Sequence, residues 1–481
     1  MTWTKTKVVA AVVVGFLLSG AAAFFVLRAL ALRTTPNASS DPRSFKFARH
    51  GPAGASDALS STHSDLRGLA DFTSNIPVIV LRSEWPGPVS GSKSYSSFKM
   101  EVYEPTGNRP ARLDNAPTVT TRVGLRLHGM VSRQFPKLSY RLQLQDKTGG
   151  SQPRSLLGMP ADDDWILQGP WLDKSLIRNA FSYDLARAMG CSAMRTHACE
   201  LFLSTSGQAV TEADYLGVYQ LTEHIERGAE RVNVTKLGSD EDSEPAITGG
   251  YILAWDVGEG NYLPTWTSIQ VKYPKQPSPA QKVWINQAFT RFDQALKGED
   301  FRDPTNGYAA HIDVDAWVNY ILFEELIFNL DAYTRSFYLQ KDRGGKIQPG
   351  PVWDHDLAMG HQFPGGTSFT DWWFIKRGPP HDWGGRLMAD PAFATRTARR
   401  WTALREGVLS DAQIDARVDA FAAPLLSGAA DRNFERWRIL NVKHPFTQPY
   451  ITFATATYPE QIAALKKFLH QRAAWMDANL H

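Results

Sequence analysis

Three aspartates near the ends of one predicted hairpin constrain this chain more than any other feature. Residues 314–330 are apolar on nearly every side, which predicts a buried helix that ends on Asp331. A short strand at 337–340, a Gly-Gly turn and a second strand that ends just before Asp354 and Asp356 are expected next. Because a tight turn brings the outer ends of two strands together, we expect all three carboxylates to share one pocket.

Such a group of carboxylates favours a divalent-metal site. Burying carboxylates side by side is unfavourable unless a cation lies between them. Any one of these aspartates alone would favour a helix-end or loop-capping role over a metal site, because acidic residues are common at such positions. Three of them together, framed by Trp353 and Gly360, favour a metal site with a separate carboxylate close by.

The same stretch carries an ordered set of residues that suggests a family. Its members are Asn329, Asp331, Ser336, Tyr338, the run Gly350-Pro-Val-Trp-Asp354, then Asp356 and Gly360. This order resembles the CotH family of spore-coat-protein-H-like atypical protein kinases. The resemblance implies that Asp331 is the catalytic aspartate, that Asp354 holds the metal and that Asp356 supports it.

Ser336 is a departure from the usual kinase pattern. Five residues after the catalytic aspartate, protein kinases place an asparagine that holds a second magnesium ion. This chain has a serine there. Since a hydroxyl can also ligate magnesium or hold a water molecule, Ser336 remains a candidate metal ligand.

The implied activity is transfer of the γ-phosphoryl group of ATP, with Mg²⁺ or Mn²⁺, to a hydroxyl of a protein substrate. The implied fold is α+β and bilobal, like that of protein kinases. A β-rich N-terminal lobe is expected over residues 76–276 and a mainly helical C-terminal lobe over residues 277–481, with a Pro-Ser-Pro boundary between them. The sequence contains no Gly-x-Gly-x-x-Gly and no Walker A motif.

Basic residues on a predicted hairpin near residues 123–144 are candidates for phosphate binding. A similar glycine, basic and Pro-Lys pattern occurs in the CotH family, and it implies that Lys137, with Arg141, neutralises phosphate charge. The alternative is that Arg133, Lys137 and Arg141 are solvated strand residues, as such side chains usually are.

Glu223 is a further candidate for nucleotide binding. It ends a predicted strand and begins a Glu-His-Ile run that also matches the family. Glu223 would pair with a lysine in the pocket or contact the nucleotide. The alternative is that Glu223 is only a charged residue at the end of a strand. A helix predicted over residues 174–189, with Asp173 as its N-cap, contains no glutamate to take that role.

The N-terminus predicts a membrane anchor. Lys5 and Lys7 precede an uncharged run, 8–27, and a helix needs about 20 apolar residues to cross a bilayer. We expect a membrane segment within residues 1–33, a flexible linker over 34–75 and a body outside the cytoplasm. A cleaved signal peptide is the alternative.

Composition limits the partners. A net charge of +3 gives no reason to expect nucleic acid as a partner.

The two cysteines, Cys191 and Cys199, are compatible with a small-loop disulfide outside the cytoplasm or with two buried free thiols.

Two other classes of function remain open at this point. The pair Asp354-His-Asp356 follows a predicted strand, and glycosyltransferases use such an Asp-x-Asp pair to hold a metal and a nucleotide sugar. A non-catalytic envelope or coat protein with a structural metal site is the other alternative.

Overall fold

The computed structural model describes residues 68–256, 260–362, 367–376, 382–443 and 452–480. All of these belong to one of the chain's two units, Phe47–His481. The predicted membrane segment and nearly all of the predicted linker lie outside the described residues. Within the described ranges, no helix has the length and apolar character needed to cross a bilayer.

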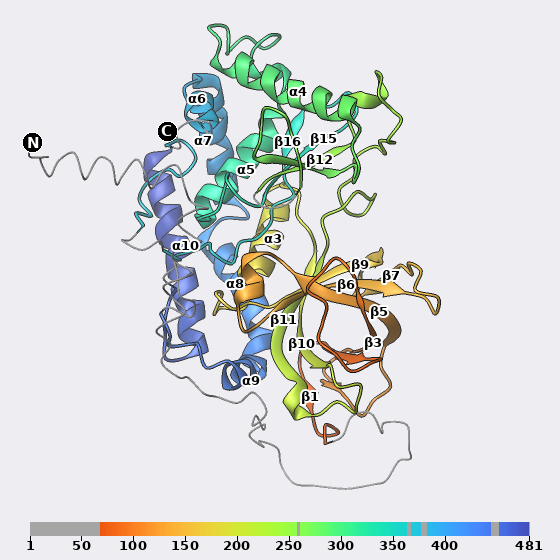
Figure 1. The fold of residues 1–481 in the computed structure, drawn as a ribbon. Coiled ribbons are helices and arrows are strands. Elements are labelled where there is room, and N and C mark those ends of the chain that lie inside the picture. The colour runs from red at the N-terminus through yellow and green to blue at the C-terminus, as the bar shows by residue number, and fades with distance from the viewer. Residues whose placement is uncertain (1–67, 257–259, 363–366, 377–381, 444–451, 481) are drawn as a thin grey trace, which may run out of the picture. The chain divides into compact units, whose positions relative to one another are not determined.

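Seven strands of the first half of the chain close into a barrel, which Figure 1 shows in orange to yellow-green. Their order around the barrel is β10 (Thr196–Ser204), β11 (Tyr215–Glu223), β9 (Asp164–Gln168), β6 (Ser139–Gln145), β5 (Val119–His128), β3 (Ser96–Tyr103) and β2 (Val78–Ser83). β10 and β2 pair in parallel, and the other neighbours are antiparallel. Alternate side chains point inward and form their own apolar core, which includes Leu81, Met100, Leu125 and Trp165.

A second sheet of five strands joins residues from both sides of the predicted boundary near residue 277. Its order is β13 (Asn261–Tyr262), β14 (Ile269–Tyr273), β12 (Tyr251–Trp255), β15 (Phe337–Lys341) and β16 (Ile347–Pro349). β15 and β16 are the predicted hairpin, and β12 pairs with β15 along its whole length. The hairpin that carries the aspartates is therefore fixed to strands from before the predicted boundary.

Shorter elements complete the β-rich part. Two ribbons pair β1 (Thr73–Ser74) with β4 (Ala111–Arg112) and β7 (Arg154–Leu156) with β8 (Met159–Asp162). Single 3₁₀ turns are η2 (Val131–Gln134), η3 (Glu212–Asp214), η4 (Ala246–Thr248) and η5 (Tyr308–Ala310).

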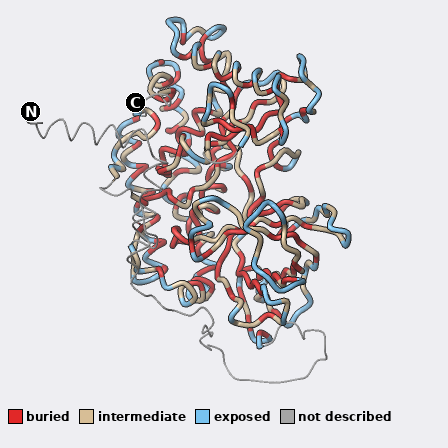
Figure 2. The backbone as a smooth tube through the Cα atoms, in the orientation of Figure 1, coloured by how far each residue is buried: buried red, intermediate tan, exposed pale blue. Residues whose placement is uncertain are grey.

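Helices dominate the second half of the chain, as the sequence predicts, so the mixed α+β class is confirmed. They are α3 (Arg178–Ala188), α4 (Pro279–Lys297), α5 (Val314–Ile327), α6 (Trp383–Met388), α7 (Pro391–Glu406), α8 (Asp411–Leu426), α9 (Ala429–Arg436) and α10 (Tyr458–Asn479). α5 is the predicted buried helix: the Asp313 side chain accepts a hydrogen bond from the N–H of Ala316, and Trp317 and Phe323 are fully buried. Figure 2 shows buried residues along the barrel strands and through the helices.

Two details differ from the sequence-based predictions. α3 begins at Arg178 rather than near residue 174, because Asp173 accepts hydrogen bonds from the backbone N–H groups of Ser175 and Arg178 and holds the chain in a turn before the helix. Cys191 and Cys199 are free thiols, since Cys199 lies in the barrel core while Cys191 packs against a different apolar cluster.

Candidate active site

Asp331 and Ser336 lie in the segment that connects α5 to β15. The helix stops because Phe328 adopts a left-handed conformation with φ of 49°. Just beyond, the carbonyl oxygen of Asp331 accepts hydrogen bonds from the backbone N–H groups of Thr334 and Arg335, at 3.2 and 3.0 Å. This turn leads through Ser336 into β15.

The returning strand brings the other two aspartates to the same place. After β16, the N–H of Val352 donates to the carbonyl oxygen of Ser192 at 2.9 Å, which fixes the chain just before the Asp-His-Asp run. Asp331, Ser336, Asp354 and Asp356 all line one cavity of about 620 Å³. The hairpin geometry predicts this meeting, and the size falls within the range of roughly 300–1,000 Å³ that is usual for small-molecule sites.

Ser336 and Asp354 contact each other directly across this cavity. The Ser336 hydroxyl donates to Oδ2 of Asp354 at 3.2 Å, and the N–H of Asp354 donates to the Tyr183 hydroxyl at 3.2 Å. Both Ser336 and Asp354 have positive φ angles, 50° and 68°, which side chains other than glycine rarely adopt. Strain of this kind costs on the order of 1–3 kcal/mol per residue and gathers at functional sites, where the surrounding structure holds it in place.

The histidine between the two aspartates points away from the cavity and anchors the loop. Nε2 of His355 lies 3.3 Å from Oε1 of Glu324 on α5, and both side chains are buried. The backbone N–H of His355 donates to Oδ1 of Asn179 on α3 at 2.7 Å. The loop is thus tied to two helices while its carboxylates face the cavity.

A buried arginine holds the residues that follow Asp356. Nε and Nη2 of Arg178 donate to the carbonyl oxygens of Ala358 and Met359, at 3.0 and 3.2 Å. Nη1 of Arg178 pairs with Asp173 at 2.5 Å, and neither side chain is appreciably exposed. α3 therefore positions this loop through its first residue.

The buried carboxylates at the cavity repel one another. Burial raises the pKa of Asp356 well above its usual value, and the nearby charges of Asp354, Asp331 and Asp173 raise it further, while Arg178 opposes them. Burial likewise raises the pKa of Asp354, against the hydrogen bond from Ser336. A bound cation would relieve both effects.

Lys137 lies elsewhere than the sequence predicts. Its side chain is 1% exposed, and Nζ donates to the carbonyl oxygen of Val218 at 2.6 Å and to Oδ1 of Asn433 at 2.7 Å. It is absent from the lining of the cavity. The predicted phosphate contact is therefore corrected: Lys137 ties the barrel to α9, and Oδ1 of Asn433 also accepts from the N–H of Val218.

Arg141 and Glu223 are both held in ion pairs. Arg141 lines the cavity, but its guanidinium donates to both oxygens of Asp164. Glu223 is buried outside the cavity lining, where it accepts from Nε and the backbone N–H of Arg195, each at 2.8 Å, with Arg231 at 3.5 Å. The structure thus corrects Glu223 from a nucleotide contact to a partner of arginines.

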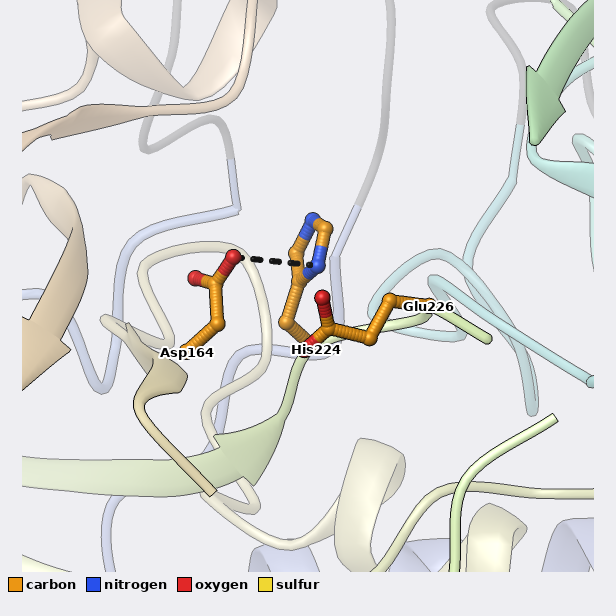
Figure 3. Close-up of side chains that lie close together, drawn as sticks. All are labelled: Asp164, His224 and Glu226. Carbon is orange, nitrogen blue, oxygen red and sulfur yellow. Dashed lines mark ion pairs between the residues drawn. The ribbon is translucent and has the colours of Figure 1, made fainter. Parts of the chain in front are cut away.

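The cavity wall instead carries His224 and Glu226, just beyond Glu223. Figure 3 shows these two side chains gathered with Asp164, and Nδ1 of His224 lies 3.7 Å from Oδ2 of Asp164. One ligand atom from each of the three residues lies within 4.8 Å of the others. Burial and the nearby Asp164 charge raise the pKa of Glu226 to about 8.

Sequence reasoning missed Asn179, Glu324 and Glu226 as parts of this region. Asn179 lies in the first turn of α3, and Glu226 follows Glu223 by three residues. Nearness in sequence to Asp173 and to Glu223 was the signal available for these two residues. Glu324 gave none, because a glutamate within an apolar helix does not show which residue it contacts.

Comparison with known proteins identifies the family of this chain. The family model described as CotH kinase protein matches residues 125–476. Among solved structures, the chain is similar to the proinflammatory kinase CtkA of Helicobacter pylori at 8% identity, covering 82% of this chain and 96% of that chain with a TM-score of 0.26, a value too low to support any argument. No curated protein matches. Since the matched residues span most of the chain, including the hairpin and its aspartates, the chain belongs to the CotH kinase family.

Proposed function

We propose that this protein is an ATP-dependent kinase that phosphorylates hydroxyl groups of a protein substrate. The observation that carries the proposal is the meeting of Asp331, Asp354 and Asp356 at one cavity. Membership of the CotH kinase family supports phosphoryl transfer. A bilobal kinase-like arrangement, with the barrel as one lobe and the helices as the other, is part of the same proposal.

Asp354, Asp356 and Ser336 fit a magnesium or manganese ion. Their donors are carboxylate and hydroxyl oxygens, which are the ligands these ions prefer. The raised pKa of Asp356, beside Asp354 and Asp331, is what a carboxylate group assembled for a cation shows without one. When bound, the ion would neutralise phosphate charge during transfer.

Asp331 is the residue proposed to orient or deprotonate the acceptor hydroxyl. It lies on a separate segment from Asp354 and Asp356, so it can face the acceptor while the other two hold the metal. A positioned base typically contributes about 10²–10⁴-fold to the rate. Lys272, Lys275 and Arg335 also line the cavity, and they replace Lys137 as the cations proposed to meet the phosphates.

The location of the activity is a separate proposal. The uncharged run 8–27 behind a short basic head supports a membrane tether with the kinase body outside the cytoplasm. Protease added to spheroplasts should digest the body, and complete protection would contradict this location.

The decisive experiment compares Asp331→Asn with Asp354→Asn in transfer of γ-labelled phosphate and in ATP·Mg²⁺ binding. Asp354→Asn should lower binding and transfer together, because it removes a metal ligand. Asp331→Asn should keep ATP·Mg²⁺ affinity within about twofold and lower turnover by about 10²–10⁴-fold. Asp240→Asn, which changes an exposed aspartate away from the cavity, is the matched control.

The same assays separate the alternatives. Preferential binding of a nucleotide sugar, with both Asp354 and Asp356 essential to it, would identify a metal-dependent glycosyltransferase instead. A loss of thermal stability in Asp354→Asn, with no nucleotide shifting the wild type, would identify a structural metal site. Full transfer activity in Asp331→Asn would remove Asp331 from the proposed mechanism.

A further inference from the structure

The cavity has a second group of possible metal ligands, outside the three aspartates. Asp164 opens β9, while His224 and Glu226 follow the end of β11. These two strands are neighbours in the barrel, so their ends meet. His224 and Glu226 line the same cavity as the proposed kinase site.

The distances suit a small metal ion. Two ligands that each lie about 2.0–2.1 Å from a zinc ion at the tetrahedral angle are about 3.4 Å apart. Nδ1 of His224 and Oδ2 of Asp164 are 3.7 Å apart, and the Glu226 donor lies within 4.8 Å of both. Figure 3 shows the three side chains gathered at one place.

Two of the three candidate ligands have an unsatisfied polar atom. Among the described residues, buried Nδ1 of His224 and buried Oε1 of Glu226 have no hydrogen-bond partner. A buried polar atom without a partner is costly, so each such atom calls for an explanation, and an ion is one of the recognised ones.

Basic side chains nearby reduce the net negative charge of the three proposed ligands. Arg141 already contacts both oxygens of Asp164, so that carboxylate brings little net charge. Asp162 adds negative charge near Glu226, against Arg231 and Lys275. Glu226 is therefore the main anionic ligand, and His224 is the ligand that selects the kind of ion.

We propose that Asp164, His224 and Glu226 form a second metal site, which takes a late first-row divalent ion such as Zn²⁺. An imidazole with carboxylates suits zinc and its neighbours, whereas magnesium prefers oxygen ligands alone. The site is distinct from the oxygen-donor group at Asp354 and Asp356. It does not depend on the proposed kinase activity, because its test measures metal binding alone.

The test uses the full chain carrying Asp354→Asn, so that the proposed magnesium site contributes less to binding. Chelator-treated protein is titrated with Zn²⁺ alone against a chromogenic chelator, and separately with Mg²⁺ alone. We expect one Zn²⁺ bound per chain, with at least a tenfold loss of affinity in His224→Gln and in Glu226→Gln. Mg²⁺ should not compete at equal concentration.

Matched controls test the same residue types away from the proposed site. Glu230→Gln changes a glutamate with 66% side-chain exposure on the same segment, and His470→Gln changes a histidine on α10 with 33% side-chain exposure. Both should leave Zn²⁺ affinity within about twofold. Unchanged affinity in His224→Gln and Glu226→Gln, or binding of Mg²⁺ as tight as that of Zn²⁺, would overturn the proposal.

A measurement without changes at the ligands guards against misfolded variants. Co²⁺ alone, added to the Asp354→Asn chain, should give the visible absorption of a low-coordinate ion with a nitrogen ligand, and Zn²⁺ should displace it. A spectrum with only the weak absorption of an all-oxygen octahedral ion would overturn the proposal.

Discussion

Replacing Lys137 by methionine gives the sharpest test of how the structure revises the predicted phosphate site. Methionine fills a similar volume but removes both hydrogen bonds from Nζ, to Val218 and Asn433. Burial lowers the pKa of Lys137 well below its usual value, so part of the lost bonding is offset by no longer burying a charge. We therefore expect a stability role and no effect on nucleotide affinity.

The size of the effect follows from those contacts. Two buried hydrogen bonds contribute about 0.5–1.5 kcal/mol each, so Lys137→Met should lower the free energy of unfolding by about 1–3 kcal/mol. Oδ1 of Asn433 still accepts from the N–H of Val218, which limits the loss. Lys137→Ala should cost about 2–5 kcal/mol, because it also leaves a cavity.

The assay pairs urea unfolding with ATP·Mg²⁺ titration and uses Lys275→Met as a matched control. Lys275 is exposed and lines the cavity, so its loss should leave stability unchanged and weaken ATP·Mg²⁺ binding. The reasoning is refuted if Lys137→Met keeps its urea midpoint but loses ATP affinity, which would return Lys137 to the phosphate site.

Three further predictions follow from buried groups. Arg178→Gln should lower the free energy of unfolding by about 3–5 kcal/mol in urea, since it breaks a buried ion pair with Asp173. Without reductant, denatured protein should show Cys191 and Cys199 both alkylated, and a mass two protons lower with no alkylation would contradict this. Burial lowers the pKa of Lys174 to about 8, so between about pH 8 and 10.5 the unfolded chain binds more protons than the folded chain. Over that range the free energy of unfolding of wild type should rise relative to that of Lys174→Met. A difference between the two proteins that does not change with pH would contradict this.

The sequence was most informative where one local pattern determines the outcome. The apolar run before Asp331 predicted α5, and the Gly-Gly turn predicted the hairpin that returns the chain to Asp354. Both depend on contacts within about thirty residues, and turn geometry alone brings the carboxylates to one cavity. The pairing of β12 with β15 was not predictable in this way, because it joins segments separated by three helical elements.

The sequence was least informative about basic residues. Lys137, Arg141 and Lys275 look alike in sequence but lie in different surroundings. Lys137 is buried against α9, Arg141 is paired with Asp164, and Lys275 is exposed at the cavity. Their roles depend on which distant segment packs over them, and α9 lies nearly three hundred residues beyond Lys137. Spacing within a motif carries no information about that contact.

Grouped acidic residues are easier to interpret from sequence than basic ones, and for this reason the candidate site could be predicted. Two buried glutamates that serve the fold have arginine partners: Glu200 contacts Arg432 at 2.5 Å, and Glu223 contacts Arg195 at 2.8 Å. Asp356, in contrast, faces two other carboxylates, and their charges raise its pKa. Because an uncompensated buried carboxylate destabilises a fold, a chain keeps several of them together only where a cation or a reaction requires them. The grouping of aspartates is therefore evidence for chemistry, whereas a run of basic residues becomes evidence only after their burial is known.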